Sequence, residues 1–201
     1  MDSYKNSHMD SFTGNRSNRS KVMHVDRIIL SWPDVLNYSQ AICRQIDRDQ
    51  WRPDYIVGLT RGGLAPAVLI SQYLSVPMHT LKVSLRDDAF TESNCWMAED
   101  AFGPETHDPM ISGSGRKNIL IVDDINDSGA TVNWIRQDWQ ASCLPRSEEW
   151  NDIWGHNVKF AVLVNNEASG SWREPDFVGR SINKLEKDVW IDFPWENWWI
   201  R

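Results

Sequence analysis

The sequence lacks several features that would assign it to a common class of protein. It has three cysteines among 201 residues, Cys43, Cys95 and Cys143, and none of them has a CxxC or Cys/His spacing. This odd, dispersed set argues against a disulfide framework or a zinc site and is typical of a reducing cytoplasm. No apolar run approaches the ~18 residues that a membrane-spanning helix needs. The N-terminus also lacks the apolar core of a signal peptide.

A basic surface is lacking too, which limits the possible partners. The chain has 21 lysines and arginines against 28 aspartates and glutamates, so its formal net charge is −7. No basic cluster stands out beyond the N-terminal stretch, so nucleic-acid binding is not expected. The length suits one domain of ordinary size. We expect a polar, loosely ordered tail over residues 1–24 and a single domain over 25–201.

Short apolar runs recur along this domain, with helical patterns between them. Strands are expected at 27–32, 55–59, 79–83, 118–122 and 159–164. Strands that alternate with helices indicate an α/β fold with helices on both faces of a mainly parallel sheet. Ligands bind such sheets at the carboxyl ends of the strands. The stretch 86–116 has little periodicity, and we interpret it as a long loop, either a solvated insertion or a lid.

Two of the expected helices can be placed on particular residues. Pro33 suits the first turn of a helix. The apolar face of this helix would consist of Val35, Leu36, Ile42, Cys43 and Ile46. The other helix is expected from about Ala130 to Ala141. Its inward face would consist of Val132, Ile135 and Trp139.

The stretch ILIVDDINDSGAT, residues 119–131, joins an apolar strand to the second of these helices. Four small residues lie where the helix begins: Ser128, Gly129, Ala130 and Thr131. Backbone amides are free at a helix N-terminus, and the helix dipole adds positive charge there. The pattern GxxxxGK[ST] is absent. The turn therefore predicts a site for one terminal phosphate rather than for a nucleoside triphosphate.

Three carboxylates accompany this turn. Asp123 and Asp124 follow Val122, where we expect the strand to end, and Asp127 comes three residues later. Asp123 and Asp124 are unsuited to hold a phosphate, because like charges repel. They suit ribose hydroxyls, or a Mg²⁺ ion with water in between. Together with the phosphate turn they indicate a phosphoribosyl group, and the alternative is that both residues merely cap the next turn.

These residues resemble a known family. ILIVDDINDSGAT is similar to the ribose-phosphate signature of type I phosphoribosyltransferases. YIVGLTRGGLAPAVLISQYLSVP resembles the pyrophosphate-loop region of xanthine-guanine phosphoribosyltransferases, and VWIDFPWE (189–196) resembles their C-terminal purine-binding segment. The resemblance covers roughly residues 26–201. It implies a type I phosphoribosyltransferase fold with a small C-terminal hood, and a cytoplasmic, Mg²⁺-dependent enzyme of purine salvage that forms a dimer or tetramer.

The resemblance also implies roles for the acidic stretch. The 5′-phosphate of phosphoribosyl pyrophosphate would be bound by Ser128, Gly129, Ala130 and Thr131, with the main chain of Asp127. Asp123 and Asp124 would contact the ribose hydroxyls, and Asp124 would reach the metal. The side chain of Asp127 would face the purine N7 and act in proton transfer. A carboxylate there also stabilises positive charge that develops on the ribose.

Two further segments complete the implied site. Arg61, Gly62 and Gly63 would form the pyrophosphate loop, although RGG alone also fits an ordinary turn between strand and helix. Trp190 would stack on the base, and the Ile191 backbone would bind the edge of the ring. Core packing is the other interpretation of Trp190. The chain has 12 tryptophans, four of them in the last dozen residues, and we expect the others near the C-terminus to pack in the hood or an interface.

One departure from the family pattern puts the preferred base in doubt. Relatives that use purines carry a lysine after the penultimate strand, where it contacts the 6-oxo group. Here Asn165 and Asn166 follow that strand, and Asn166 aligns best. An amide can donate to a 6-oxo group or accept from a 6-amino group. Transfer to guanine, xanthine or hypoxanthine is the leading hypothesis. The alternatives are a regulatory module that senses phosphoribosyl pyrophosphate or nucleotides, and an enzyme for another base.

Overall fold

A five-stranded parallel sheet forms the centre of the molecule, in the order β3-β2-β4-β5-β6. The computed structural model describes residues 26–83, 95–103, 115–144 and 147–200. The expected tail over 1–24 therefore lies outside the described residues. The strands of the sheet are β2 (Tyr55–Thr60), β3 (Met78–Lys82), β4 (Ile119–Asn126), β5 (Val158–Asn166) and β6 (Phe177–Ile182).

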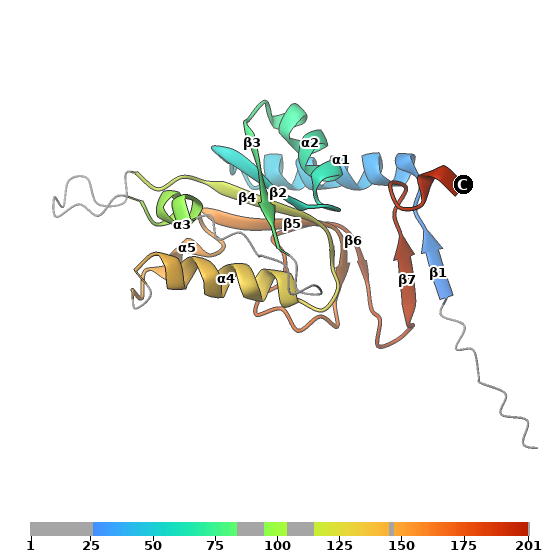
Figure 1. Ribbon diagram of the computed structural model, residues 1–201. Helices are drawn as coiled ribbons and strands as arrows, with labels where there is room; N and C mark the ends of the chain where they lie inside the picture. Colours follow the sequence, from blue (N-terminus) through green and yellow to red (C-terminus); the bar gives the residue numbers. More distant parts are fainter. Residues whose placement is uncertain (1–25, 84–94, 104–114, 145–146, 201) are drawn as a thin grey trace, which may run out of the picture.

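Helices cover both faces of this sheet (Figure 1). One face packs against α1 (Trp32–Arg48) and α2 (Leu64–Leu74). The other packs against α3 (Cys95–Phe102), α4 (Ala130–Ser142) and α5 (Trp150–Ile153). Each face buries its own apolar cluster, because the strands are apolar on both sides. The predicted α/β fold with a mainly parallel sheet is confirmed.

Helix α1 begins where its sequence predicts. Ser31 is the N-cap, and its hydroxyl accepts from the Asp34 amide at 3.3 Å while the Asp34 carboxylate accepts from the Ser31 amide at 2.7 Å. This reciprocal capping box satisfies backbone donors that the first turn leaves free. Four of the five predicted face residues are buried, but Leu36 is 46% exposed. Ser39, three residues further along the helix, is buried although it is polar. The helix face that contacts the sheet therefore differs from the apolar face predicted from the sequence.

Strand β4 is longer than predicted. It continues past Val122 through Asn126, so the acidic pair lies within the strand and not beyond its end. The cause is the neighbouring strand β5, which is also long and pairs with this extension. Ile125 is in register with Val164, and Asn126 with Asn165.

Two short strands form a separate parallel pair, the hood, beside the central sheet. β1 (Asp26–Ile29) pairs with β7 (Val189–Asp192), and the 3-10 helix η1 (Trp198–Ile200) follows (Figure 1). Arg27 donates to both carboxylate oxygens of Asp192, at 2.6 and 2.7 Å. The strand predicted over 27–32 therefore exists in part, but it is shorter and does not join the main sheet.

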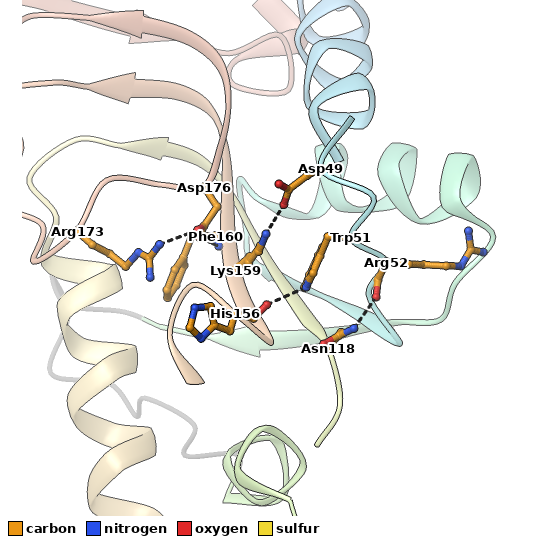
Figure 2. Close-up of polar contacts among 9 residues, drawn as sticks. All are labelled: Asp49, Trp51, Arg52, Asn118, His156, Lys159, Phe160, Arg173 and Asp176. Atoms are coloured by element: carbon orange, nitrogen blue, oxygen red, sulfur yellow. Dashed lines mark hydrogen bonds and ion pairs between the residues drawn. The ribbon is translucent and has the colours of Figure 1, made fainter. Parts of the chain in front are cut away.

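Polar contacts hold the amino ends of the strands together, opposite the edge where a ligand is expected (Figure 2). Trp51 Nε1 donates to the His156 carbonyl at 2.8 Å, and Asn118 Nδ2 donates to the Arg52 carbonyl at 3.0 Å. Lys159 pairs with Asp49 at the end of α1. These contacts join segments before β2, β4 and β5, and so they support the frame rather than a site.

The long loop predicted over 86–116 contains a helix that the sequence pattern did not reveal. Helix α3 buries Met97, Ala98, Ala101 and Phe102 against the α4 face of the sheet. The rest of the predicted lid, apart from residues 103, 115 and 116, lies outside the described residues.

Candidate active site

Three adjoining cavities open at the carboxyl edge of the sheet, and Asp124 lines all of them. The first, of about 510 Å³, lies between the turn after β2 and the turn after β4. The second, of about 800 Å³, is shared by the turn after β2 and the hood. The third, of about 210 Å³, lies between the end of β4 and strand β7. The strand ends thus bring the predicted motifs into one continuous site.

The first cavity ends at the N-terminus of α4, where an anion is expected. Its wall there consists of Asp127, Ser128, Gly129, Ala130, Thr131 and Val132. Gly129 has a φ of 80°, which favours glycine, and a Cβ on it would lie 2.2 Å from the Ser171 amide nitrogen. Gly170 donates to the Ser128 carbonyl at 3.1 Å. The turn is therefore held against residues 169–171, and it forms part of the cavity wall.

A buried amide network stands behind this turn. Asn126 Nδ2 donates to Asn165 Oδ1 at 2.8 Å and to the Ser169 hydroxyl at 2.9 Å. Asn165 Nδ2 donates in turn to the Glu174 carboxylate at 2.7 Å. The sequence analysis did not assign Asn126 or Glu174 to the site. Their position follows from the extra length of β4 and β5, which no short motif encodes.

Asp123 and Asp124 form an acidic pair that is unfavourable when both carboxylates are charged. Burial raises the pKa of Asp123 well above its usual range, and the charge of Asp124 raises that pKa further. Burial and the nearby charge of Glu196 raise the pKa of Asp124 to about 6. A cation or a set of hydroxyl donors would relieve this cost.

The turn after β2 lies directly against this pair. Gly62 approaches so closely that a Cβ on it would be 1.8 Å from Asp124 Oδ2. Arg61 and Gly62 line both the first and the second cavity. Gly63 is buried, and a Cβ on it would be 2.4 Å from the Val122 carbonyl oxygen. Gly63 thus packs the turn onto β4 and is not part of the lining of these cavities.

The third cavity combines a flat aromatic wall with opposite charges. Trp190, on β7, is 45% exposed although its neighbours Val189 and Ile191 are buried. Ile191 also lines the cavity, and so do Asp127 and Lys184. Lys184 Nζ lies 2.7 Å from Asp127 Oδ1. The sequence analysis missed Lys184 because it took the strand at 159–164 as the penultimate one; the structure adds β6 after it, and Lys184 follows β6.

Asn166 lies behind the third cavity, and its amide is already engaged. Its Nδ2 donates to the Asp127 carbonyl at 2.8 Å. Its Oδ1 accepts from the Ala168 amide at 3.2 Å and from the Lys184 amide at 3.0 Å. The side chain is 5% exposed and is not part of the lining of the three cavities. Its predicted contact with a base stays a prediction.

The acidic pair is the place in the described part of the chain where a divalent cation fits. Among the described residues, no three acidic, histidine or cysteine side chains gather as a metal site. Mg²⁺ does not need such a cage, because it binds through one or two carboxylates and completes its shell with water and phosphate oxygens. Asp123 and Asp124 supply that donor chemistry next to a cavity that suits an anion.

The site as a whole can hold a molecule with three different parts. The helix terminus suits a phosphate, the acidic pair suits hydroxyls with a cation, and Trp190 suits a flat ring. Asp127 lines both the first and the third cavity, so it lies at the junction of the two.

A comparison with protein families and known proteins agrees with this geometry. The family model described as phosphoribosyl transferase domain matches residues 27–198. The chain is similar to the xanthine-guanine phosphoribosyltransferase of Roseobacter denitrificans. The two are 27% identical over 190 residues, 89% of this chain and 90% of that protein.

Solved structures show the same fold. A xanthine-guanine-hypoxanthine phosphoribosyltransferase from Helicobacter pylori aligns with a TM-score of 0.58 and 18% identity, over 87% of this chain and 96% of its own. A purine phosphoribosyltransferase from Pyrococcus horikoshii aligns with a TM-score of 0.55 and 22% identity, over 86% and 96%. Within the described residues, no helix is long and apolar enough to cross a membrane.

Proposed function

Since this chain belongs to the phosphoribosyl transferase domain family, we propose that it transfers the 5-phosphoribosyl group of phosphoribosyl pyrophosphate to a purine. The acceptor would be a 6-oxopurine: guanine, xanthine or hypoxanthine. A ring nitrogen of the base forms a bond to the anomeric carbon, and pyrophosphate leaves with the electrons of the bond that breaks. The products are a nucleoside monophosphate and pyrophosphate.

The observation that carries this proposal is the position of Asp127. Asp127 lines the cavity at the phosphate turn and also the cavity in front of Trp190. A ribose bound by its phosphate in the first cavity would present its anomeric carbon to a base in the third. Asp127 would accept a proton from the N7 of that base, and its charge would stabilise positive charge on the ribose.

The remaining residues would orient the two substrates. Ser128, Gly129, Ala130 and Thr131 would donate to the 5′-phosphate, and Asp123 and Asp124 would accept from the ribose hydroxyls. Arg61 and Gly62 border the 800 Å³ cavity and would face the pyrophosphate. Bound Mg²⁺, held by Asp124, would neutralise charge on the pyrophosphate.

The two alternative functions predict different behaviour. A regulatory module would bind phosphoribosyl pyrophosphate or a nucleotide without turnover, but the carboxylate of Asp127 between the two cavities favours catalysis. An enzyme for another base would use the same site and would differ in the base that it accepts. The similarity to xanthine-guanine phosphoribosyltransferases favours 6-oxopurines.

The proposal is tested by measuring pyrophosphate release with guanine, xanthine, hypoxanthine, adenine and uracil, each with and without Mg²⁺. We expect turnover with at least one 6-oxopurine, none with uracil, and loss of activity when Mg²⁺ is chelated. Binding of phosphoribosyl pyrophosphate without release from any base would contradict the proposal and favour a sensor.

We further propose that the protein is a cytoplasmic homo-oligomer. The three cysteines form no disulfide, which suits a reducing compartment. Trp198, Trp199 and Ile200 leave large apolar surfaces exposed on η1, beside the hood. Exposed apolar surface of this kind marks contact with another chain.

A further inference from the structure

The 800 Å³ cavity receives positive charge from two elements that are far apart in the chain. Arg61, in the turn after β2, lines this cavity, and so does Arg27, on β1. Neither arginine lines the 210 Å³ cavity in front of Trp190, where the base would bind. The sequence analysis assigned Arg61 to the pyrophosphate and gave Arg27 no role. Arg27 is therefore a second cation at the cavity in which the pyrophosphate is expected.

The pairing of β1 with β7 determines the face of the hood on which Arg27 lies. Arg27 is in register with Trp190, and Ile28 is in register with Ile191. Successive side chains of a strand lie on opposite faces, and residues in register share a face. Trp190 lines the 800 Å³ cavity, whereas Ile191 is buried in the apolar cluster that contains α1 and α2. Arg27 thus shares the face of the hood that borders the site.

Asp192 holds the guanidinium group of Arg27 in one orientation. Nη2 of Arg27 donates to Oδ1 of Asp192 at 2.6 Å, and Nε donates to Oδ2 at 2.7 Å. Two parallel bonds of this kind fix the plane of the guanidinium group. The side chain of Asp192 is 10% exposed and that of Arg27 is 56% exposed. Among the described residues the Arg27 side chain makes no other hydrogen bond, so several of its N–H donors remain for a ligand.

The charges around the 800 Å³ cavity are unfavourable for an anion unless cations take part. The carboxylates that line it are those of Asp124, Asp192 and Glu196. Pyrophosphate carries several negative charges, and these carboxylates would repel it. Arg27 neutralises Asp192 and can also meet the anion. A guanidinium group suits phosphate oxygens, because it is planar, keeps its charge and donates two bonds side by side.

We propose that Arg27 binds the pyrophosphate group of phosphoribosyl pyrophosphate from the side of the hood, and that Asp192 orients it for this contact. The inference rests on the proposed transferase function and adds a residue to the pyrophosphate half of the same site. Arg27 keeps its two bonds to Asp192 and donates to phosphate oxygens with the N–H groups that remain. Arg61 meets the same anion from the turn after β2.

The test compares Arg27→Gln with Arg44→Gln in the purified full chain. Arg44 lies on α1, is exposed and is not part of the walls of the three cavities. For Arg27→Gln we expect KM for phosphoribosyl pyrophosphate to rise roughly 10- to 100-fold, because hydrogen bonds between charged groups are lost. Calorimetry with pyrophosphate and Mg²⁺ should show a similar loss of affinity. The affinity for ribose 5-phosphate, which lacks the pyrophosphate, should stay within about threefold of the wild type.

A nucleotide separates direct contact from a structural role of Arg27 in the hood. Guanosine monophosphate would reach Trp190 but contains no pyrophosphate, so its affinity should be the same in Arg27→Gln and the wild type. Equal weakening of guanosine monophosphate and pyrophosphate would assign Arg27 to the structure of the hood and overturn the inference. Arg44→Gln should bind every ligand as the wild type does, and an equal loss of pyrophosphate affinity there would also overturn it.

A double variant separates direct contact from the charge that Arg27→Gln leaves unpaired on Asp192. Arg27→Gln combined with Asp192→Asn contains a neutral pair in place of the charged one. We expect it to bind pyrophosphate at least about tenfold more weakly than the wild type, because the guanidinium donors are still missing. Recovery of wild-type affinity would show that the unpaired carboxylate caused the loss, and it would overturn the inference.

The outcomes also distinguish this inference from the proposed function. An active wild type, together with unchanged pyrophosphate affinity in Arg27→Gln, would overturn the inference alone. A wild type that binds pyrophosphate but releases none with any base would overturn the transferase function, and weaker binding by Arg27→Gln would still support the contact. A wild type that does not bind pyrophosphate in the presence of Mg²⁺ would overturn the inference.

Discussion

Asp127 is the residue whose substitution best separates catalysis from binding. Asp127→Asn keeps the shape of the side chain and removes the charge that would accept a proton. We expect kcat to fall by about 10²-fold or more, with the affinity for phosphoribosyl pyrophosphate nearly unchanged. Steady-state kinetics measure kcat, and calorimetry measures the affinity for phosphoribosyl pyrophosphate. Asp188→Asn, at an exposed position, is the control. Unchanged turnover would remove Asp127 from the mechanism.

A second prediction concerns Asp124 and the pH dependence of folding stability, measured in the presence of a chelator. Its folded-state pKa of about 6 lies above the ordinary 3.8 of an unfolded chain. The folded protein therefore binds more protons between these values, and stability falls as pH rises through that window. Asp124→Asn removes this loss, so we expect a Tm about 2–4 °C above the wild type at pH 7.5.

The difference in Tm between Asp124→Asn and the wild type should shrink as pH is lowered to 4, because the wild-type carboxyl is then protonated in the folded protein. Thermal melts at both pH values provide the measurement. A variant that melts below the wild type at pH 7.5 would show that the carboxylate stabilises the fold instead.

Single residues also show how much of the site the sequence can predict. The thirteen residues 119–131 form a strand, a turn and a helix start, so a local pattern was enough to predict their place. Lys184 and Asn166 could not be understood in this way. Their relation to Asp127 depends on three segments that meet only in the folded chain.

Among the elements, the turn between β4 and α4 depends on its support by residues 169–171. Gly129→Ala would place a methyl group 2.2 Å from the Ser171 amide nitrogen, in a backbone conformation with a φ of 80°. We expect KM for phosphoribosyl pyrophosphate to rise at least about tenfold, because the helix amides would move away from the phosphate.

Gly170→Ala is the matched control for this substitution. A Cβ on Gly170 meets nothing closer than the Ser128 carbonyl at 3.4 Å, an ordinary contact. Kinetics for both variants, together with circular dichroism for folding, check the prediction. Similar KM values for the two variants would show that the turn adapts without cost.

Element boundaries were predicted less well than element types. The strand expected over 118–122 extends to Asn126, because β5 provides hydrogen-bond partners for the added residues. The strand expected over 27–32 is cut short, because Ser31 caps α1. The longer β4 depends on a strand that is distant in the sequence, and the shorter β1 depends on a helix cap. Neither cause is visible in the apolar pattern of the sequence.

For the whole molecule, the exposed apolar end of η1 predicts an assembly. Trp199 is 66% exposed and lies between Trp198 and Ile200, which are exposed as well. If this end is buried between copies, Trp199→Glu should give a smaller species than the wild type. Sedimentation velocity measures this, with Leu144→Glu, an exposed apolar position just after α4, as a control. A wild type that is monomeric would contradict the proposed oligomer.

The pairing of β1 with β7 has a consequence for the way the protein is made. Arg27 and Asp192 are 165 positions apart in the chain. During translation β1 leaves the ribosome long before β7. It therefore stays unpaired during the time in which the central sheet can already form. The hood, which carries Trp190, is therefore completed last. A chain that stopped short during translation would contain the turn between β4 and α4 but would lack the strand that carries Trp190.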